Sequence, residues 1–118
     1  GWSLVEHRLM RNWLLLHESE FKIEMKVKIG DVSITPDAII MGTVWKFVEV
    51  DISQSWRANV DKLERYAAIK SKKAFQKQYN HFPTIIYVVQ MESRKEKIMN
   101  KCRELGLHCE VYTVNEIG

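Results

Sequence analysis

Apolar side chains recur at helical spacing at the start of the chain. Four of them fall on one helical face: Leu4, Leu9, Trp13 and Leu16. Ser3 and Glu6 have the spacing of a capping box, in which the two residues satisfy free backbone N–H groups of the first turn. We therefore predict a helix over 3–17.

A strand pattern follows this helix. Over 21–29 apolar residues alternate with charged ones, which is typical of a half-exposed strand, and Gly30 ends it. Two apolar runs, 34–41 and 44–51, are then joined by a turn that contains Gly42, and they predict a hairpin. The second run is apolar on both faces, so we expect a central strand that is covered on both sides.

Helices and strands alternate over the rest of the chain. Helices are predicted over 55–79 and 93–105, the second with Ser93 as its N-cap. Continuous apolar runs predict strands over 84–91 and 107–114. The expected order is α-β-β-β-α-β-α-β, which favours a mixed five-stranded sheet in a three-layer α/β/α sandwich.

Length and composition limit the class of protein. The 118 residues fit one domain over 1–118, and 46% hydrophobic with 28% charged residues is ordinary for a globular protein. No apolar run approaches the length of a membrane span and no signal peptide is visible, so we expect a cytoplasmic protein. The start at Gly1 without a Met suggests either a trimmed chain or a domain of a longer chain. Cys102 and Cys109 lack metal-site spacing and are expected to be free thiols.

Positive charge is concentrated in the second half of the chain. Residues 57–104 hold 12 of the 18 basic residues and five of the 15 acids. Such a surface favours a polyanionic partner. An ordinary solvated surface rich in lysine accounts for the charge equally well.

Acids interrupt the hairpin where a buried strand should be apolar. Asp37 lies in the first run, and Glu49 and Asp51 share one face of the second. Pairing about the turn places Asp37 opposite 48–50. Converging carboxylates repel each other unless a cation lies between them, and hard oxygen ligands suit Mg²⁺ or Mn²⁺. The alternative is that the three acids lie at frayed strand ends and are simply solvated.

The following helix carries a polar face beside its buried stripe. Its members are spaced three or four residues apart: Asn59, Lys62, Tyr66, Lys70, Lys73 and Lys77. Lys62 is close enough along the helix to approach the carboxylates. Lys70, Lys73 and Lys77 could then bind successive phosphates of a polyanion, or they could form an ordinary solvated face.

Histidine and tryptophan residues are predicted to be structural. The four histidines have no spacing typical of metal sites, and the chain has no glycine-rich phosphate loop. The four tryptophans are expected to anchor the core or an interface rather than to stack on bases.

These residues, in this order of elements, resemble the PD-(D/E)XK nuclease superfamily with its restriction-endonuclease-like fold. Pro36 and Asp37 match the PD element, and Glu49-Val50-Asp51 matches the (D/E)XK element with Asp51 in the usual lysine position. In some members of the superfamily the lysine lies on the next helix, where this chain has Lys62. The segment "DKLERY" also resembles the QxxxY motif of the exonuclease branch, with Tyr66 as its tyrosine.

The resemblance implies a metal-dependent deoxyribonuclease. Asp37, Glu49, Asp51 and the Val50 carbonyl would bind Mg²⁺ or Mn²⁺, and Lys62 would orient the attacking water or stabilise charge on the phosphate. Four residues of the helix would position the nucleic-acid backbone: Tyr66, Lys70, Lys73 and Lys77. Glu6 would be an accessory metal ligand.

The first helix adds a narrower resemblance. His7 and Asn12, together with the later motifs, resemble the replication-relaxation family of plasmids and mobile elements. The partners implied are DNA, replication proteins or a second copy of the chain. Two alternatives remain open because of Asp51: a nuclease-like domain that binds DNA or a replication protein without cutting, and an assembly module that has lost the site.

Overall fold

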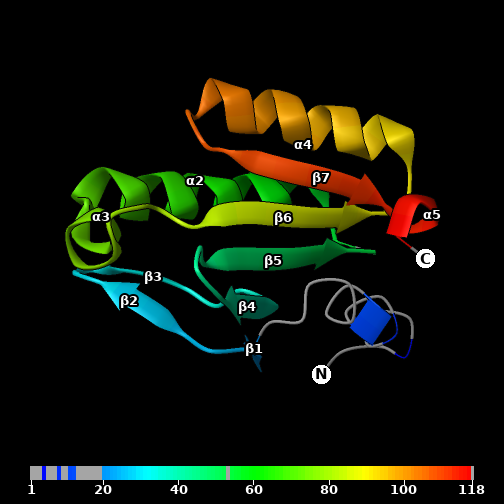
Figure 1. Cartoon of the computed structure of the whole chain (residues 1–118). Coiled ribbons are helices and arrows are strands. Elements are labelled where there is room, and N and C mark those ends of the chain that lie inside the picture. Colours follow the sequence, from blue (N-terminus) through cyan, green and yellow to red (C-terminus); the bar gives the residue numbers. More distant parts are fainter. Residues whose placement is uncertain (1–3, 5–7, 9–10, 13–19, 53, 118) are drawn as a thin grey trace.

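The computed structural model describes residues 4, 8, 11–12, 20–52 and 54–117. Most of the predicted helix over 3–17, including Glu6, lies outside these residues. The described part is an α/β domain built on a mixed sheet (Figure 1). None of its helices is long and apolar enough to cross a membrane.

Strands from both halves of the chain form the mixed sheet. In spatial order they are β1 (Glu20–Ile23), β4 (Ala38–Met41), β5 (Lys46–Asp51), β6 (Thr84–Val89) and β7 (Cys109–Thr113). The β1/β4 and β4/β5 pairs are antiparallel, whereas the β5/β6 and β6/β7 pairs are parallel. The prediction of a mixed sheet with 44–51 in its centre is confirmed, because β5 has a neighbour on each side.

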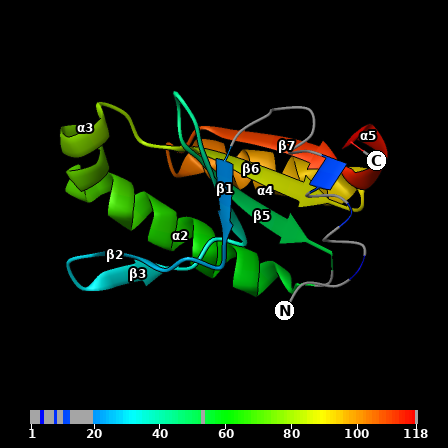
Figure 2. The same ribbon diagram turned by 60° about the horizontal axis from the view of Figure 1, so that its bottom comes forward.

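The strand predicted over 21–29 is not continuous. Glu24 has a left-handed backbone with φ of 53°, which ends β1. The chain then leaves the sheet as β2 (Val27–Ile29), turns at Gly30 with φ of 63°, and returns as β3 (Val32–Ile34). This separate antiparallel pair lies beside the helix α2 (Figure 2). The predicted order of elements is therefore wrong at this point.

The helix predicted over 55–79 is also divided. The helix α2 (Trp56–Lys72) begins where predicted, because the Ser55 hydroxyl oxygen accepts a hydrogen bond of 3.1 Å from the backbone N–H of Ala58. Lys73 adopts a left-handed conformation with φ of 60° and ends it. The chain continues in a new direction as α3 (Ala74–Tyr79).

The C-terminal elements differ from the prediction in their ends. The helix α4 (Glu92–Glu104) has Met91 as its N-cap residue in place of Ser93. After Thr113 the chain forms the short helix α5 (Val114–Ile117), which begins at the last residue of the strand predicted over 107–114.

Cys102 and Cys109 form a disulfide, so the prediction of free thiols is wrong. Cys102 lies in the last turn of α4 and Cys109 begins β7, with 6.4 Å between their Cα atoms. Gly106, whose φ is 70°, makes the turn between the helix and the strand. The Leu107 N–H donates back to the Cys102 carbonyl at 2.8 Å and closes this turn.

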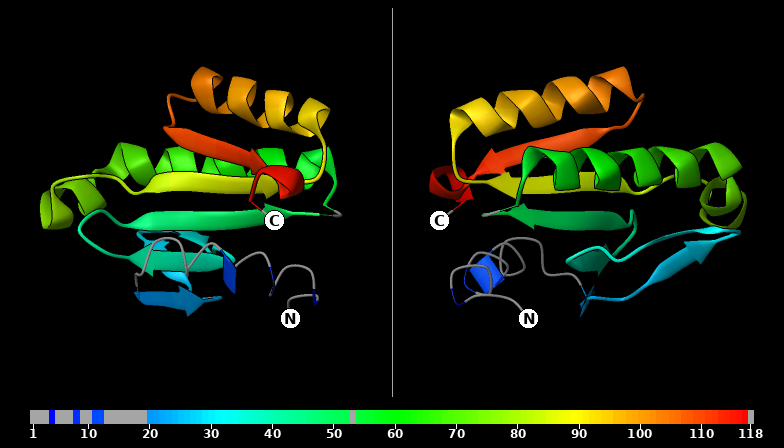
Figure 3. Two further views of the ribbon diagram at one scale, coloured as in Figure 1. Left: turned by 45° about the vertical axis from the view of Figure 1, so that its right-hand side comes forward. Right: turned by 180° about the vertical axis from the view of Figure 1, so that it is seen from behind.

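The two long helices cover the same face of the sheet. One cluster joins sheet residues to α2 and α4: Ile39, Phe47, Ile85, Tyr87, Val111, Leu63, Ile69 and Ile98. The opposite face has a separate cluster: Ala38, Ile40, Val48, Val50, Ile86 and Val88. Of the described helices, only α5 contributes residues there (Figure 3). The described elements thus form two layers, and the third layer of the predicted sandwich is not among them.

Candidate active site

Glu49 is a buried acid in the middle of β5, with 1% of its surface exposed. Its Oε1 forms an ion pair with the Lys62 ammonium, and its Oε2 accepts a hydrogen bond from the Tyr66 hydroxyl at 2.5 Å. Lys62 and Tyr66 are one helical turn apart on α2, so they lie on the same face of the helix. The packing of α2 on this face of the sheet brings both donors to one carboxylate.

Burial dominates the electrostatics of Glu49. Loss of solvent raises the pKa of Glu49 to about 8, while the Lys62 charge opposes this rise and the Asp37 charge adds to it. The pKa of Tyr66 is raised well above its usual value, mainly by burial and then by Glu49. Tyr66 therefore keeps its proton and acts as a hydrogen-bond donor.

Asp37 comes directly before β4 and lies close to Glu49. The hairpin register pairs Ala38 with Val48, and one further step places Asp37 opposite Glu49. The Oδ2 of Asp37 accepts a hydrogen bond of 2.7 Å from the backbone N–H of Val50. This register agrees with the predicted position of Asp37 opposite 48–50, and it puts Asp37 and Glu49 on one face.

Asp51, two residues beyond Glu49, points to the same face but has different partners. Its Oδ2 accepts a hydrogen bond of 2.9 Å from the Asn59 amide and lies 3.4 Å from the Arg94 guanidinium. The guanidinium also lies over the Trp56 ring, 5.7 Å from its centre. Burial raises the pKa of Asp51, and Arg94 opposes that rise.

Arg94 and Tyr87 also lie at the site, and neither is predicted there from the sequence. Arg94 lies in the first turn of α4, far along the chain from Asp51, and the parallel pairing of β5 with β6 brings the two together. Tyr87 is the residue of β6 that pairs with Glu49. The available signal was the strand order, because helices that follow adjacent parallel strands begin at the same edge of a sheet.

Three buried polar atoms near Asp51 lack a hydrogen-bond partner within the described chain. They are Asn59 Oδ1, Tyr87 Oη and Arg94 Nη1, the last of which is ion-paired with Asp51 at 3.4 Å. Buried polar groups are normally satisfied, so this concentration marks a place where a further polar group can be bound.

The fit of the predicted metal ligands can be tested on this geometry. Among the residues described, no group of three His, Cys, Asp or Glu side chains is arranged to hold a metal ion. Asp37 and Glu49 do form an adjoining pair of oxygen ligands suited to a hard divalent cation. Asp51 is held instead by Asn59 and Arg94, which leaves a two-carboxylate site. Lys62 and Tyr66 already occupy Glu49, so a bound ion must share it with them or displace them.

The predicted phosphate-binding lysines lie along a path that the Lys73 break divides. Lys70 donates a 2.6 Å hydrogen bond to the Gly106 carbonyl. Lys73 is exposed at the break, and Lys77 is exposed on α3. These three residues therefore do not form one continuous helical face.

No protein family, curated protein or solved structure matched the chain in the comparisons made.

Proposed function

We propose that this chain is a divalent-metal-dependent nuclease domain of the PD-(D/E)XK type. The observation that carries the proposal is the environment of Glu49. Asp37 faces Glu49 across the hairpin, and α2 supplies Lys62 and Tyr66 to its two oxygens. An acid pair can bind a divalent cation, and a lysine beside it can stabilise charge on a phosphate.

The strand arrangement supports the same proposal. Strand β4 is antiparallel to both of its neighbours, β1 and β5, and β5 is parallel to β6. The helix α2 lies between β5 and β6 along the chain. This is the arrangement expected of a restriction-endonuclease-like core. In the proposal, the β2–β3 pair is an insertion that precedes the PD element and β7 extends the far edge of the sheet.

In the proposed mechanism, Asp37, Glu49 and the Val50 carbonyl would hold the cation. When bound, the cation lowers the pKa of a water molecule and reduces the negative charge of the phosphate. Lys62 moves its hydrogen bond from Glu49 to the phosphate and stabilises the charge that develops there. Tyr66 keeps its bond to Glu49 and fixes the orientation of that carboxylate.

Arg94 can replace the charge that the usual lysine would supply. Asp51 occupies the lysine position and holds the Arg94 guanidinium, which also rests on Trp56. The Nη1 of Arg94 lies 3.4 Å from Asp51 Oδ2 and makes no hydrogen bond to the described residues. A planar guanidinium has five N–H donors, so it can pair with Asp51 and also bind a phosphate oxygen.

A second function is binding to DNA or to a replication protein without cleavage. One observation favours it: every carboxylate of the site already has a partner from the chain, including Asp51 with Asn59 and Arg94. In this case Lys62 is a structural counter-ion and no metal is needed.

DNA cleavage with Mn²⁺ or Mg²⁺ separates the two functions. Supercoiled and linear DNA are incubated with the wild type and with Asp37→Asn, Glu49→Gln and Lys62→Ala variants. Loss of one ligand or of the lysine should lower the rate by at least about a hundredfold, as loss of a single electrostatic group does at other active sites. Asp61→Asn and Glu64→Gln, on exposed positions of α2, are matched controls that should cut normally.

Calorimetric titration with Mn²⁺ gives the second measurement. Asp37→Asn and Glu49→Gln should lose metal binding, whereas Lys62→Ala should retain it. Cleavage by Glu49→Gln at the wild-type rate would reject the active site. Metal-independent DNA binding with no cleavage by the wild type would establish the second function instead.

A further inference from the structure

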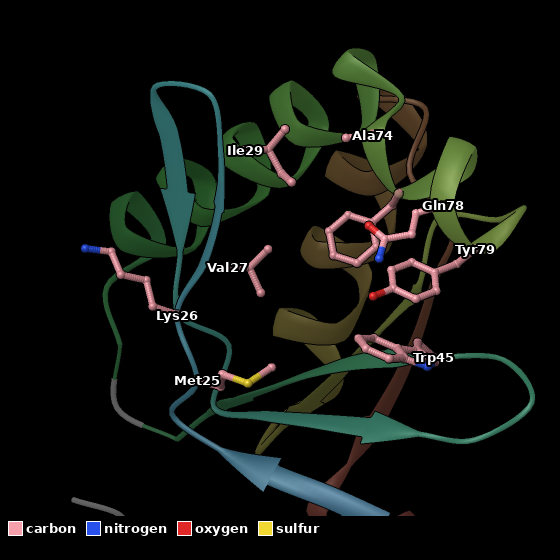
Figure 4. Close-up of a pocket in the computed structure, with 9 residues that line it drawn as sticks. Met25, Lys26, Val27, Ile29, Trp45, Ala74, Gln78 and Tyr79 are labelled. Carbon is pink, nitrogen blue, oxygen red and sulfur yellow. The ribbon is translucent and has the colours of Figure 1, made fainter.

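A pocket of about 250 Å³ opens at the end of β5 opposite Asp51. Its walls come from β2 and the two residues before it, from α3 and from Trp45 just before β5. The lining residues are Met25, Lys26, Val27, Ile29, Trp45, Ala74, Phe75, Gln78 and Tyr79. Figure 4 shows Met25, Val27 and Ile29 on one side of the space and Trp45 and Tyr79 on the other.

Internal contacts hold the aromatic wall in place. The Trp45 and Tyr79 rings stack with 4.7 Å between their centres, and Phe75 lies 5.7 Å from Tyr79. The His81 ring connects the wall to the backbone. Its Nε2 accepts a hydrogen bond of 3.1 Å from the Trp45 N–H, and its Nδ1 lies 2.9 Å from the Tyr79 carbonyl. The aromatic wall is thus preorganised before any ligand binds.

Two polar groups face the space between the walls. The Gln78 amide and the Tyr79 hydroxyl both point into it, whereas the Lys26 side chain points away toward solvent (Figure 4). An amide and a hydroxyl can both donate and accept hydrogen bonds. A flat ligand that enters between the walls can therefore form hydrogen bonds along its edge.

Positive charge surrounds the pocket. The segments 24–31 and 72–79, which supply most of its lining, contain five lysines and two acids. The lysines are Lys26, Lys28, Lys72, Lys73 and Lys77, all of them exposed. One of the acids, Asp31, pairs with Lys72 at 3.3 Å. A ligand that combines a flat ring with negative charge is complementary to this surface.

We propose that this pocket binds one unstacked base of single-stranded nucleic acid, whose phosphates contact Lys73 and Lys77. The volume lies below the range of about 300–1,000 Å³ typical of drug-sized ligands, so it fits a single ring system and leaves the sugar and phosphate outside. The bases of duplex DNA are paired and stacked, so the pocket selects single strands, ends or gaps.

This inference rests on the proposed function, because it names the substrate class of the same domain. The core connects the two places: Phe47 of β5 stacks on Tyr66 at 5.4 Å and meets Phe75 of the pocket at 5.6 Å. The inference requires that the phosphates next to a bound base follow the surface toward Lys62, which is paired with Glu49.

Binding to oligonucleotides with and without bases tests the inference. Fluorescence anisotropy is measured in EDTA, where no cleavage occurs, with labelled oligothymidylate, with an abasic oligomer of equal length and charge, and with duplex DNA. The wild type should bind oligothymidylate about tenfold more tightly than the abasic oligomer or the duplex. Neither of these two ligands can place a base against the aromatic wall of the pocket. Equal affinity for oligothymidylate and the abasic oligomer would overturn the inference.

Pocket variants provide the second half of the test. Ala74→Leu fills the pocket and should remove the preference for bases. Tyr79→Phe and Gln78→Ala should each weaken oligothymidylate binding about fivefold and leave abasic binding unchanged. Tyr112→Phe removes the hydroxyl of a half-buried tyrosine on β7 and is the matched control that should bind normally. If Ala74→Leu fails to fold, Gln78→Ala, at an exposed position, decides the question alone.

Two further outcomes distinguish other occupants and the parent proposal. A dimer in sedimentation that Ala74→Leu abolishes would place a second copy of the chain in the pocket and overturn the inference. Preference for bases without any DNA cleavage in Mn²⁺ would support the pocket and reject the nuclease. DNA cleavage without preference for bases would support the nuclease and overturn the inference about the pocket.

Discussion

The side chains at the two ends of β5 differ in what they contact. At the Asp51 end, buried carboxylates are matched by donors from α2 and α4. At the Trp45 end, rings and an amide border an open pocket. The first end is stabilised by contacts within the chain, and the second has surface available for a ligand. The buried charges therefore contribute to the stability of the fold as well as to the proposed catalysis, whereas the open aromatic surface is available to bind a ligand.

This difference predicts different costs of substitution. Removing one partner of a buried ion pair leaves an uncompensated charge, so the acid end should be sensitive to single changes. Removing a group that faces a solvent-filled pocket loses little in the free chain, so the aromatic end should be tolerant. Stability measurements can therefore test the comparison independently of any ligand.

The largest effect is expected from Lys62→Met. It leaves Glu49 with only Tyr66, and breaking a buried pair in this way costs about 3–5 kcal/mol of unfolding free energy. The loss should be greatest above the Glu49 pKa of about 8, because below it the carboxyl can take up a proton. Urea unfolding on either side of that pH measures both quantities.

The matched control for Lys62→Met is the double variant Lys62→Met with Glu49→Gln. It removes both charges and should recover most of the stability, since no buried charge is left unpaired. A single variant as stable as the wild type would show that Glu49 is not held by Lys62, and the comparison would lose its first half.

Asn59→Ala should have the next largest effect. Asn59 is fully buried and its amide donates to Asp51, so the substitution removes this hydrogen bond and opens a small cavity. We expect a loss of about 2 kcal/mol in unfolding free energy, measured by urea unfolding. Asn100→Ala, at an exposed position of α4, is the control and should change stability by less than about 0.5 kcal/mol. Equal losses in the two variants would contradict the role given to Asn59.

Glu49 should also make stability depend on pH. Its folded-state pKa is raised from 4.5 to about 8, so the folded state binds the proton more tightly than the unfolded state. This contribution is complete below 4.5 and is lost as pH rises to about 8, by up to about 1.4 kcal/mol per pH unit. The difference in unfolding free energy between the wild type and Glu49→Gln across this range isolates it. A difference that does not change with pH would mean that Glu49 is ionised throughout.

The main features of the fold could be predicted from the sequence because they follow from periodicity. The apolar runs of β5 and β6 and the start of the helix predicted from 55 are local signals, and the structure contains each of them. The breaks at Glu24 and Lys73 could not be predicted in this way. Neither residue favours a left-handed backbone, so packing between separate segments must stabilise both.

The residues of the candidate site also fall into those that local patterns predict and those that they do not. Glu49 and Asp51 share a face because strands alternate, and Lys62 with Tyr66 follows from helical spacing, so these four could be placed from the sequence. Arg94 and Tyr87 arrive through the parallel pairing of β5 with β6, and local patterns do not give strand order. The pocket depends on where α3 lies after the Lys73 break, which no local pattern indicated. Trp45, predicted as an anchor, has this role and also lines the pocket.

The smallest effect is expected from Tyr79→Phe in the absence of ligand. The Tyr79 hydroxyl faces the pocket, so its removal should change the unfolding free energy by less than about 0.5 kcal/mol. Tyr66→Phe removes a hydroxyl that donates to buried Glu49 and should cost about 1–3 kcal/mol. The two changes are chemically identical, and urea unfolding compares them directly. Equal costs would mean that the Tyr79 hydroxyl is as firmly engaged within the chain as that of Tyr66, and the two ends of β5 would then not differ.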